Sequence, residues 1–189
     1  SGALPAPLEV LEERTVGAGL GADSIQEGIV ASVIGLVLVV VFMLAAYGLF
    51  GLFTSITVFM NLFLLLGALS LMGATLTLPG IAGIILTIGM AVDANVLIFE
   101  RMREEVKNGR STRDAADAGF TEAMATIIDS NLTTLVAAIV LFYFGTGPVR
   151  GFAVTLAIGI ATSMFTSVTV TRLIITAWIN KYRPTKLPI

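Results

Sequence analysis

An uncharged run of 65 residues is the feature that most constrains this chain. After Glu27 the next charged side chain is Asp93, so residues 28–92 carry no formal charge. Two further uncharged stretches cover residues 130–149 and 151–171. An α-helix needs roughly 20 apolar residues to cross the hydrocarbon core of a bilayer. The chain is therefore predicted to be an integral membrane protein that crosses the bilayer several times.

The composition agrees with this prediction and excludes other classes of protein. Hydrophobic residues make up 56% of the chain and charged residues 13%, which is about half the charged share of a soluble domain. The chain has no Cys and no His, so no disulfide and no Cys- or His-ligated metal site is expected. Its net charge of −2 gives no sign of a nucleic-acid-binding surface. We expect no cofactor, no metal, no nucleic-acid partner and, without a nucleophile–base set, no enzyme.

Turn-forming residues divide the uncharged stretches into five predicted spans. Glycines within 48–51 end the first span, and Pro79 suits the first turn of the third. The fourth span must begin before residue 132, because residues 132–144 alone are too short to cross a bilayer. The spans cover about residues 28–49, 53–72, 79–99, 126–144 and 149–179. The expected fold is therefore all-α, a five-span helical bundle that occupies residues 28–189.

The distribution of Lys and Arg predicts the orientation, because cytoplasmic ends of membrane spans are enriched in these residues. With five spans, nine of the 11 basic residues lie in the connection 100–125 or near the C-terminal tail. Only Arg14 and Arg150 lie on the opposite side. We therefore expect a cytoplasmic C-terminus and an N-terminal segment outside the cytoplasm.

The segments outside the spans give weaker signals. Residues 1–27 are interpreted as the remnant of a larger external domain and its linker, with weak alternation that predicts a short β-strand within residues 8–16. In the connection 100–125, the sequence predicts two short amphipathic helices at the membrane surface, separated at Asn108 and Gly109.

Asp93 is the strongest candidate for a functional residue. It lies 8 residues before Arg101, which is roughly 12 Å inside the charged boundary at about 1.5 Å per residue. An ionised carboxylate facing lipid there costs at least about 2.5–3.5 kcal/mol. Intramembrane carboxylates usually belong to ion pathways, so we interpret Asp93 as a proton-relay site. The alternative is a neutral Asp that only forms hydrogen bonds within the bundle.

Several polar or small residues are candidates to support this site. Gly89 lies near Asp93 on the same predicted helix, and Asn95 lies on another face. Two hydroxyls of the fifth span, Thr162 and Thr166, share a sector with other threonines and could support a water chain, or could bond to carbonyls of their own helix. In the fourth span, Asp129 and Thr133 share one face. A separate stripe of small residues is interpreted as helix packing: Gly80, Gly83, Thr87, Ala91 and Ala94.

Three segments of the sequence resemble known motifs. Residues 78–101 read LPGIAGIILTIGMAVDANVLIFER, residues 129–135 read DSNLTTL, and residues 145–153 read GTGPVRGFA. The first closely resembles the signature of the SecD family of bacterial protein-export membrane proteins, within the resistance-nodulation-division (RND) superfamily, and the other two are similar to further segments of that family. The third contains the turn residues Gly145, Gly147, Pro148 and Gly151. Residues 2–7 resemble the return from the family's periplasmic domain, so the likeness covers essentially the whole chain.

The resemblance implies a function and a set of partners. Members of the SecD family have six spans and a large periplasmic domain, and they pair with the related six-span protein SecF. Together they use the proton-motive force to help the SecYEG channel move unfolded polypeptide across the bacterial inner membrane, in association with YajC and YidC and in contact with membrane lipid. The intramembrane Asp of the motif, here Asp93, is implied to lie on the proton pathway. The first span and most of the periplasmic domain have no counterpart in this chain.

Two other functions remain open at the level of sequence. The chain could be a scaffold that holds export partners together, with Asp93 as a structural hydrogen bond. It could also be half of an RND-type exporter of small molecules or lipids, although the sequence contains no external domain that could form a substrate pocket. The scaffold hypothesis predicts that Asp93→Asn keeps both assembly and activity.

Overall fold

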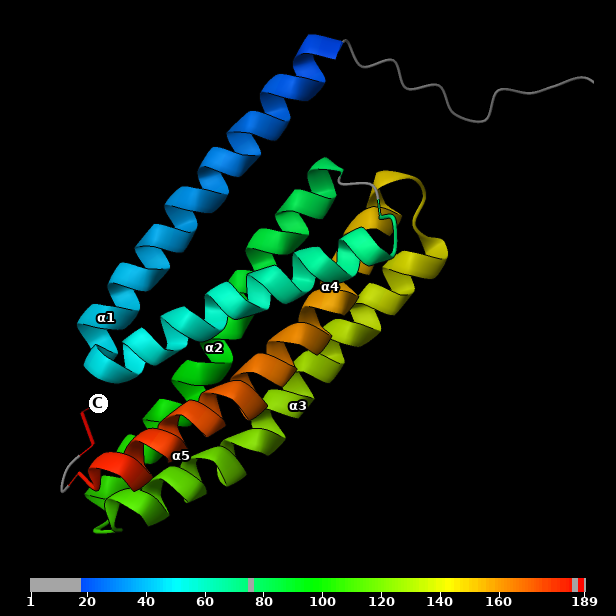
Figure 1. Cartoon of the computed structure of the whole chain (residues 1–189). Helices are drawn as coiled ribbons and strands as arrows, with labels where there is room; N and C mark the ends of the chain where they lie inside the picture. The colour runs from blue at the N-terminus through cyan, green and yellow to red at the C-terminus, as the bar shows by residue number, and fades with distance from the viewer. Residues whose placement is uncertain (1–17, 75–76, 185–186, 189) are drawn as a thin grey trace, which may run out of the picture.

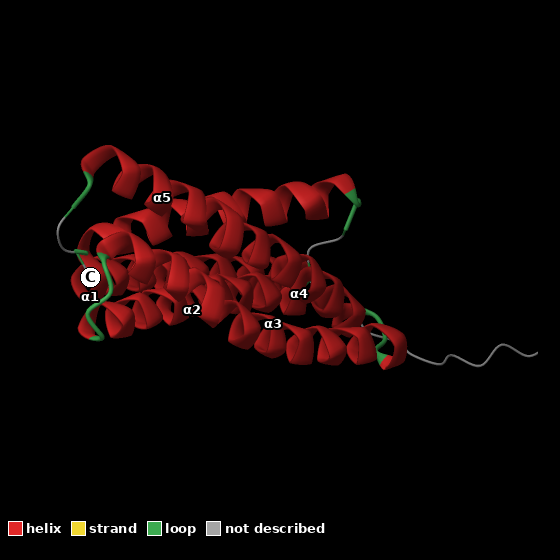
Figure 2. Cartoon of the chain, turned by 90° about the horizontal axis from the view of Figure 1, so that it is seen from below, coloured by secondary structure: helices red, strands yellow, loops and turns green. Residues whose placement is uncertain are grey.

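The computed structural model describes residues 18–74, 77–184 and 187–188, and these residues are almost entirely helical. The helices are α1 (Ala18–Leu71), α2 (Leu78–Lys107), α3 (Thr112–Phe144), α4 (Pro148–Met164) and α5 (Thr171–Tyr182), with a π-helix, η1 (Phe165–Val170), between α4 and α5. Figure 2 shows them running lengthwise, with the loops gathered at the two ends. The all-α prediction is confirmed for this part of the chain.

Helix α1 bends sharply at Gly48. The backbone of Gly48 has φ 52° and ψ −119°, a conformation that glycine adopts far more easily than other residues. Figure 1 shows the two arms of α1 running in different directions from this point, with the first arm standing away from the other helices. The break predicted between the first two spans therefore exists, but as a kink within one long helix.

Within the described ranges, four helices are long and apolar enough to cross a membrane, since α1 counts as one helix and α4, η1 and α5 run on as another. Their length and composition confirm a multi-pass helical membrane protein. Each arm of α1 is itself long enough for a crossing, at about 1.5 Å of rise per residue. The number of crossings therefore depends on how α1 lies in the membrane.

The helices extend further into the segments outside the predicted spans than the sequence indicated. Residues 18–27, assigned to a linker, are already part of α1, which begins at Ala18. The connection 100–125 does not contain separate surface helices, because α2 and α3 continue into it and only the turn at residues 108–111 interrupts them. Nothing in the sequence between the apolar and charged parts of these helices breaks the backbone hydrogen-bond pattern. The β-strand predicted within residues 8–16 lies outside the described residues.

The helix ends follow ordinary capping chemistry. The hydroxyl of Thr77 accepts a hydrogen bond from the Gly80 amide, and Pro79 lies in the first turn of α2, as predicted. Ser111 caps α3 by accepting from the amide of Asp114. Gly109, with φ 86°, lies in the turn between the two helices. These local signals are why the sequence located the turns correctly.

Helix α2 lies at the centre of the bundle, where it packs against α1, α3 and α4. All five small residues of the stripe on α2 are buried, which confirms their role in packing. A Cβ atom placed on Gly159 of α4 would collide with the Thr87 side chain, so the two helix backbones approach closely here. Because this face of α2 packs against α4, the other faces of α2 are the ones that contact α3 or lie on the surface of the bundle.

The two ends of the bundle differ in charge and packing. One end carries the α1 kink, the α2–α3 turn and the last described residues, and Figure 1 shows that the start of α1 lies at the opposite end. Buried aromatic rings fill the first end, where Phe50 contacts Phe99 and Trp178 with ring centroids 5.3 and 5.8 Å apart. We call this the charged end, because the basic residues of α2, α3 and α5 lie there.

Candidate functional site

Asp93 lies in the middle of α2, on the side that faces α3. Its side chain is exposed in this chain, whereas the flanking Val92 and Ala94 are buried. It lines a small cleft of about 150 Å³ between the two helices. The cleft is lined by Met90, Asp93, Ala94 and Leu97 of α2 and by Ile127, Ser130, Asn131 and Thr134 of α3. Asp93 therefore shares a cleft with a polar strip of α3.

The polar groups of α3 are held in place by their own helix. Asn131 donates its Nδ2 to the Ile127 carbonyl at 2.7 Å, and Ser130 donates to the same carbonyl at 3.1 Å. Thr134 donates to the Ser130 carbonyl at 3.0 Å. With these donors occupied, the side-chain oxygens of all three residues can still accept hydrogen bonds. The cleft thus offers hydrogen-bond acceptors beside Asp93.

No basic side chain lines this cleft among the described residues. A carboxylate in a membrane without a paired cation is costly, so the ionised form of Asp93 needs either water or a cation from another chain. The described residues also contain no group of three Asp or Glu side chains that could hold a metal ion.

Leu97 lines both the cleft and a larger cavity at the charged end. This second cavity, about 610 Å³, shares Leu97 with the first and is otherwise lined mostly by charged side chains. These include Glu100, Arg101, Glu104 and Glu122. The charged cavity therefore adjoins the Asp93 cleft at Leu97.

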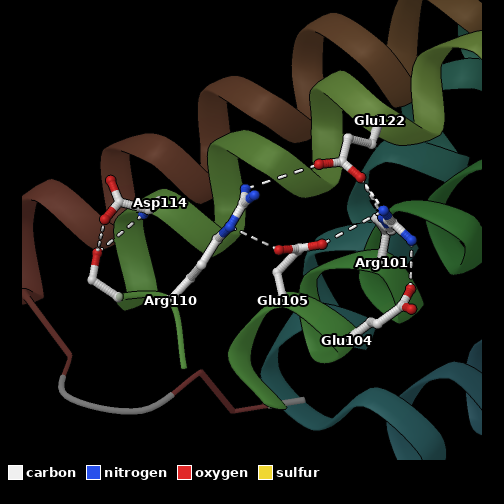
Figure 3. A network of polar contacts seen from close by, with 7 residues as sticks. Arg101, Glu104, Glu105, Arg110, Asp114 and Glu122 are labelled. Atoms are coloured by element: carbon white, nitrogen blue, oxygen red, sulfur yellow. Dashed lines mark hydrogen bonds and ion pairs between the residues drawn. The ribbon is translucent and has the colours of Figure 1, made fainter. Parts of the chain in front are cut away.

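An ion-pair network ties α2 to α3 at the wall of the charged cavity (Figure 3). Arg101 bonds Glu122 of α3 and Glu104 of its own helix, the latter at 2.6 Å. Glu105 is only 4% exposed and pairs with Arg110 at 2.9 Å and with Arg101 at 3.6 Å. Exposed ion pairs contribute about 0–1 kcal/mol each to the free energy of unfolding. Only the ion pairs of the buried Glu105 are shielded enough from solvent to contribute more. The network fixes the relative position of α2 and α3 beyond Leu97.

The other residues predicted on α2 occupy two different faces. Asn95 is buried on the face away from the cleft, where its Nδ2 donates to the Ala91 carbonyl at 2.9 Å and lies 3.5 Å from the Ser167 hydroxyl. Gly89 is exposed, one turn before Asp93, and a Cβ atom there would meet nothing within 4 Å. Gly89 and Asp93 thus share an open face, which Asn95 does not.

The residues of α3, α4 and η1 that the sequence suggested as support for Asp93 do not line the cleft. Asp129 and Thr133 are exposed, and the Thr133 hydroxyl donates to the Asp129 carbonyl. Thr162 donates to the Gly159 carbonyl, and Thr166 to the Thr162 carbonyl. These hydroxyls therefore bond to their own helices, which was the alternative interpretation of the threonine sector. The structure places none of the four beside Asp93.

The turn between α3 and α4 has the geometry that its glycines require. Gly147 has φ 49°, and Pro148 opens α4. A Cβ atom on Gly145 would collide with the Leu141 carbonyl oxygen, and one on Gly151 would lie 3.1 Å from the Thr77 hydroxyl. These four residues shape the turn and the packing beside it. None of them lines the Asp93 cleft.

Sequence reasoning missed the residues of α3 that do face Asp93. It chose Asp129 and Thr133, whereas the structure places Ser130, Asn131 and Thr134 in the cleft. In the structure, Ile127, Asn131 and Ala138 are buried and recur at helical spacing, but an isoleucine, an asparagine and an alanine form no apolar pattern by which the sequence could have located this face. That spacing defines the buried stripe of α3, and Thr134 lies within it.

Comparison with known proteins identifies the family. The model of the family described as "Protein export membrane protein SecD/SecF, C-terminal" matches residues 4–181. The chain belongs to this SecD/SecF family. It is 54% identical over its whole length to the protein translocase subunit SecD of Rhodobacter capsulatus, and 58% identical over 182 residues to that of Calditerrivibrio nitroreducens. The SecD resemblance of the three motifs is thereby confirmed.

Solved structures show the same fold for a SecD/SecF protein. The crystal structure of SecDF, a translocon-associated membrane protein from Thermus thermophilus, superposes with a TM-score of 0.90 at 45% identity and covers 96% of this chain. A structure of SecDF in a form named super-membrane-facing superposes with a TM-score of 0.83 at 46% sequence identity. The chain spans about a third of the length of the curated relatives and 25% of the length of the chains in these structures.

Proposed function

We propose that this chain is the transmembrane part of a SecD-type subunit that couples the proton-motive force to protein export across the bacterial inner membrane. The proposal rests on membership of the SecD/SecF family and on one carboxyl, Asp93, that lines a polar cleft at membrane depth. SecF and the SecYEG translocon are the proposed partners. The SecDF protein of known structure is itself described as translocon-associated.

The observation that carries the proposal is the open side of the Asp93 cleft. Asp93 and Gly89 are both exposed on α2, although α2 is otherwise the most enclosed helix of the bundle. Small and polar residues on an exposed face of a membrane helix favour close approach of another helix. SecF is proposed to cover this face and to supply the cation that no described residue of this chain brings to the cleft.

The mechanism follows from the two charge states of Asp93. When protonated, the carboxyl is neutral and can donate to the oxygens of Ser130, Asn131 or Thr134. When ionised, it requires a cation or water, and it favours a different packing of the cleft. Protonation from the periplasmic side and release past Leu97 into the charged cavity would drive the bundle through both packings in turn.

The direction of this cycle requires an orientation of the bundle. We propose that each arm of α1 crosses the membrane, so that the five predicted spans are present and the charged end is cytoplasmic. The start of α1 and the C-terminus lie at opposite ends of the bundle, which supports an odd number of crossings. The excess of Lys and Arg at the charged end supports its cytoplasmic location.

The test is gradient-dependent translocation in inverted membrane vesicles that contain the full-length parent protein. Asp93→Asn removes the titrating group with little change of shape. Asp117→Asn is the matched control, because Asp117 is an exposed carboxylate at the charged end with one long ion pair, 3.6 Å from Arg172. Assembly with SecF is measured for both variants before activity is compared.

We expect Asp93→Asn to remove the gradient-dependent part of translocation while assembly with SecF is kept, and Asp117→Asn to resemble the parent. Unchanged translocation with Asp93→Asn would overturn the proton-coupled function. In that case the scaffold function would be the one that remains.

A further inference from the structure

Several buried polar atoms without a hydrogen-bond partner lie on α1, α2 and α4, on residues that do not line the Asp93 cleft. They belong to four residues that are at most 1% exposed. They are Thr54 Oγ1, both side-chain polar atoms of Asn61, Asn95 Oδ1 and Ser163 Oγ. Native proteins leave very few buried polar atoms unpaired, and lipid provides no water to satisfy them. Five such atoms on helices that contact one another therefore need an explanation.

The register of the helices places two of these residues, Asn61 and Asn95, at the level of η1. The second arm of α1 runs antiparallel to α4–α5, since Phe50 contacts Trp178 and the Thr57 hydroxyl lies 3.3 Å from that of Thr171. Asn61 lies one turn beyond Thr57, so it faces the level of η1, about one turn before Thr171. From the other side, Asn95 of α2 reaches the Ser167 hydroxyl of η1.

We infer that this group of residues is a binding site for internal water molecules. We call it the polar seam, and it consists of Thr54, Thr57, Asn61, Asn95, Ser163, Ser167 and Thr171. Internal water typically makes two to four hydrogen bonds to buried polar groups that would otherwise be unpaired. The five unpaired atoms of the seam include both donors and acceptors, which suits water because it can donate and accept at the same site.

The chemistry of the seam favours water over a cation. The seam contains no Asp or Glu, and its amide groups are neutral. A cation bound there would be a buried charge without a counter-charge, which is strongly unfavourable in a membrane protein. The Asn61 amide nitrogen, moreover, is a donor and cannot bind a cation. The seam is also distinct from the Asp93 cleft, with which it shares no lining residue.

The π-helix gives the seam a structural consequence. In η1 the amide of Thr171 bonds the Thr166 carbonyl, five residues back, and such wide turns are frequently found at functional sites. The seam lies where the second arm of α1 meets η1. A hydrated polar contact can exchange hydrogen-bond partners more easily than a dry apolar one, so this interface is where the two elements can shift relative to each other.

The test uses the absence of Cys from the chain. Asn61→Cys and Ser163→Cys are introduced singly into the full-length parent protein in membranes and exposed to Ag⁺, a thiol-binding ion close to water in size. Val58→Cys and Leu65→Cys are the matched controls, since both positions are at most 1% exposed on the same arm of α1 but are apolar. Blocked thiols are then counted by mass spectrometry of the peptides that contain them.

A hydrated seam predicts that the thiols at residues 61 and 163 are blocked several times faster than those at 58 and 65. Equal, slow rates at all four positions would overturn the inference, because they would show a dry interior. Faster blocking that is suppressed when Na⁺ replaces choline in the buffer would also overturn it, since a cation would then occupy the seam.

A second measurement does not depend on the cysteine variants. If Asn61 is dry and unpaired, Asn61→Leu removes a buried polar group without a partner and should raise the melting temperature of the purified protein. If Asn61 binds water that also serves Asn95 and Ser163, the same change removes a shared ligand and should lower the melting temperature. The inference predicts the lower value, and a raised melting temperature would contradict it.

Discussion

At the residue scale, the proposed activity depends on which side chains of α3 face Asp93. Ser130, Asn131 and Thr134 line the cleft, whereas Thr133 points elsewhere although it is adjacent in sequence. The two threonines both donate to their own helix, at 2.9 Å for Thr133 and 3.0 Å for Thr134. They differ mainly in whether their oxygen can accept a hydrogen bond from Asp93.

The adjacent threonines give the first prediction. Thr134→Val should lower gradient-dependent translocation roughly fivefold, since one hydrogen bond to the protonated carboxyl is worth about 1 kcal/mol. Thr133→Val makes the same chemical change outside the cleft and should leave the rate near that of the parent. Translocation in inverted vesicles measures both, and equal losses in the two variants would contradict the assignment of Thr134 to the site.

The second prediction concerns the apolar barrier at Leu97. Leu97→Ala should speed the decay of an imposed pH gradient in proteoliposomes that contain the full-length complex, because the cleft and the charged cavity would then be joined. Leu86→Ala is the control, since Leu86 is an exposed leucine on α2 that lines neither cavity. If the gradient decays equally fast in both variants and in the parent, Leu97 is not a barrier to protons.

At the scale of elements, the sequence predicted turns better than it predicted helix lengths. Turns depend on local chemistry, such as Thr77 and Pro79 at the start of α2 or Gly109 before α3. Helix length depends on where the backbone hydrogen-bond pattern ends. Hydropathy indicates only where the apolar, lipid-facing part of a helix ends, and a helix can continue beyond it. For this reason α2 and α3 extend into the predicted connection 100–125, and α1 begins before residue 28.

The candidate site was predictable in part for a similar reason. Asp93 stands out because a charge within an apolar helix is rare at any position. The choice of its neighbours requires the rotation of α3 about its axis, which depends on packing with α2. Gly119 contributes to that packing, because a Cβ atom there would collide with Met102. No periodic pattern in α3 singles out this glycine.

The kink in α1 gives the third prediction. Gly48→Ala should destabilise the protein by about 1–3 kcal/mol, since a side chain at φ 52° and ψ −119° is strained. Gly35→Ala, in the straight first arm where a Cβ atom would meet nothing within 4 Å, should be neutral or stabilising by up to about 1 kcal/mol. Denaturation of the two variants in detergent measures the difference, and equal stabilities would argue against the kink.

At the scale of the whole molecule, α1 decides the number of membrane crossings. If each arm crosses, the start of α1 near Asp23 and its end near Met72 lie on the same side of the membrane. If α1 crosses once, they lie on opposite sides. Lys107, at the charged end of α2, lies on the side opposite to Met72 in either case, because α2 crosses once.

The fourth prediction follows from this geometry. In the full-length protein, Asp23→Cys and Met72→Cys should both react with a membrane-impermeant maleimide from the periplasmic side, and Lys107→Cys only from the cytoplasmic side. Labelling of intact cells and of inverted vesicles measures the side for each variant. Reaction of residues 23 and 72 from opposite sides would show a single crossing by α1 and an even total.

Under the proposed function, the Asp93 carboxyl gains and loses a proton during export. The most direct measurement is infrared difference spectroscopy of the full-length complex with SecF in membranes, recorded as the pH is changed across the range in which export operates. We predict a carbonyl band of a protonated carboxylic acid that appears at the lower pH and is missing in Asp93→Asn. A difference spectrum that is identical in the parent and in Asp93→Asn would contradict proton coupling at this residue.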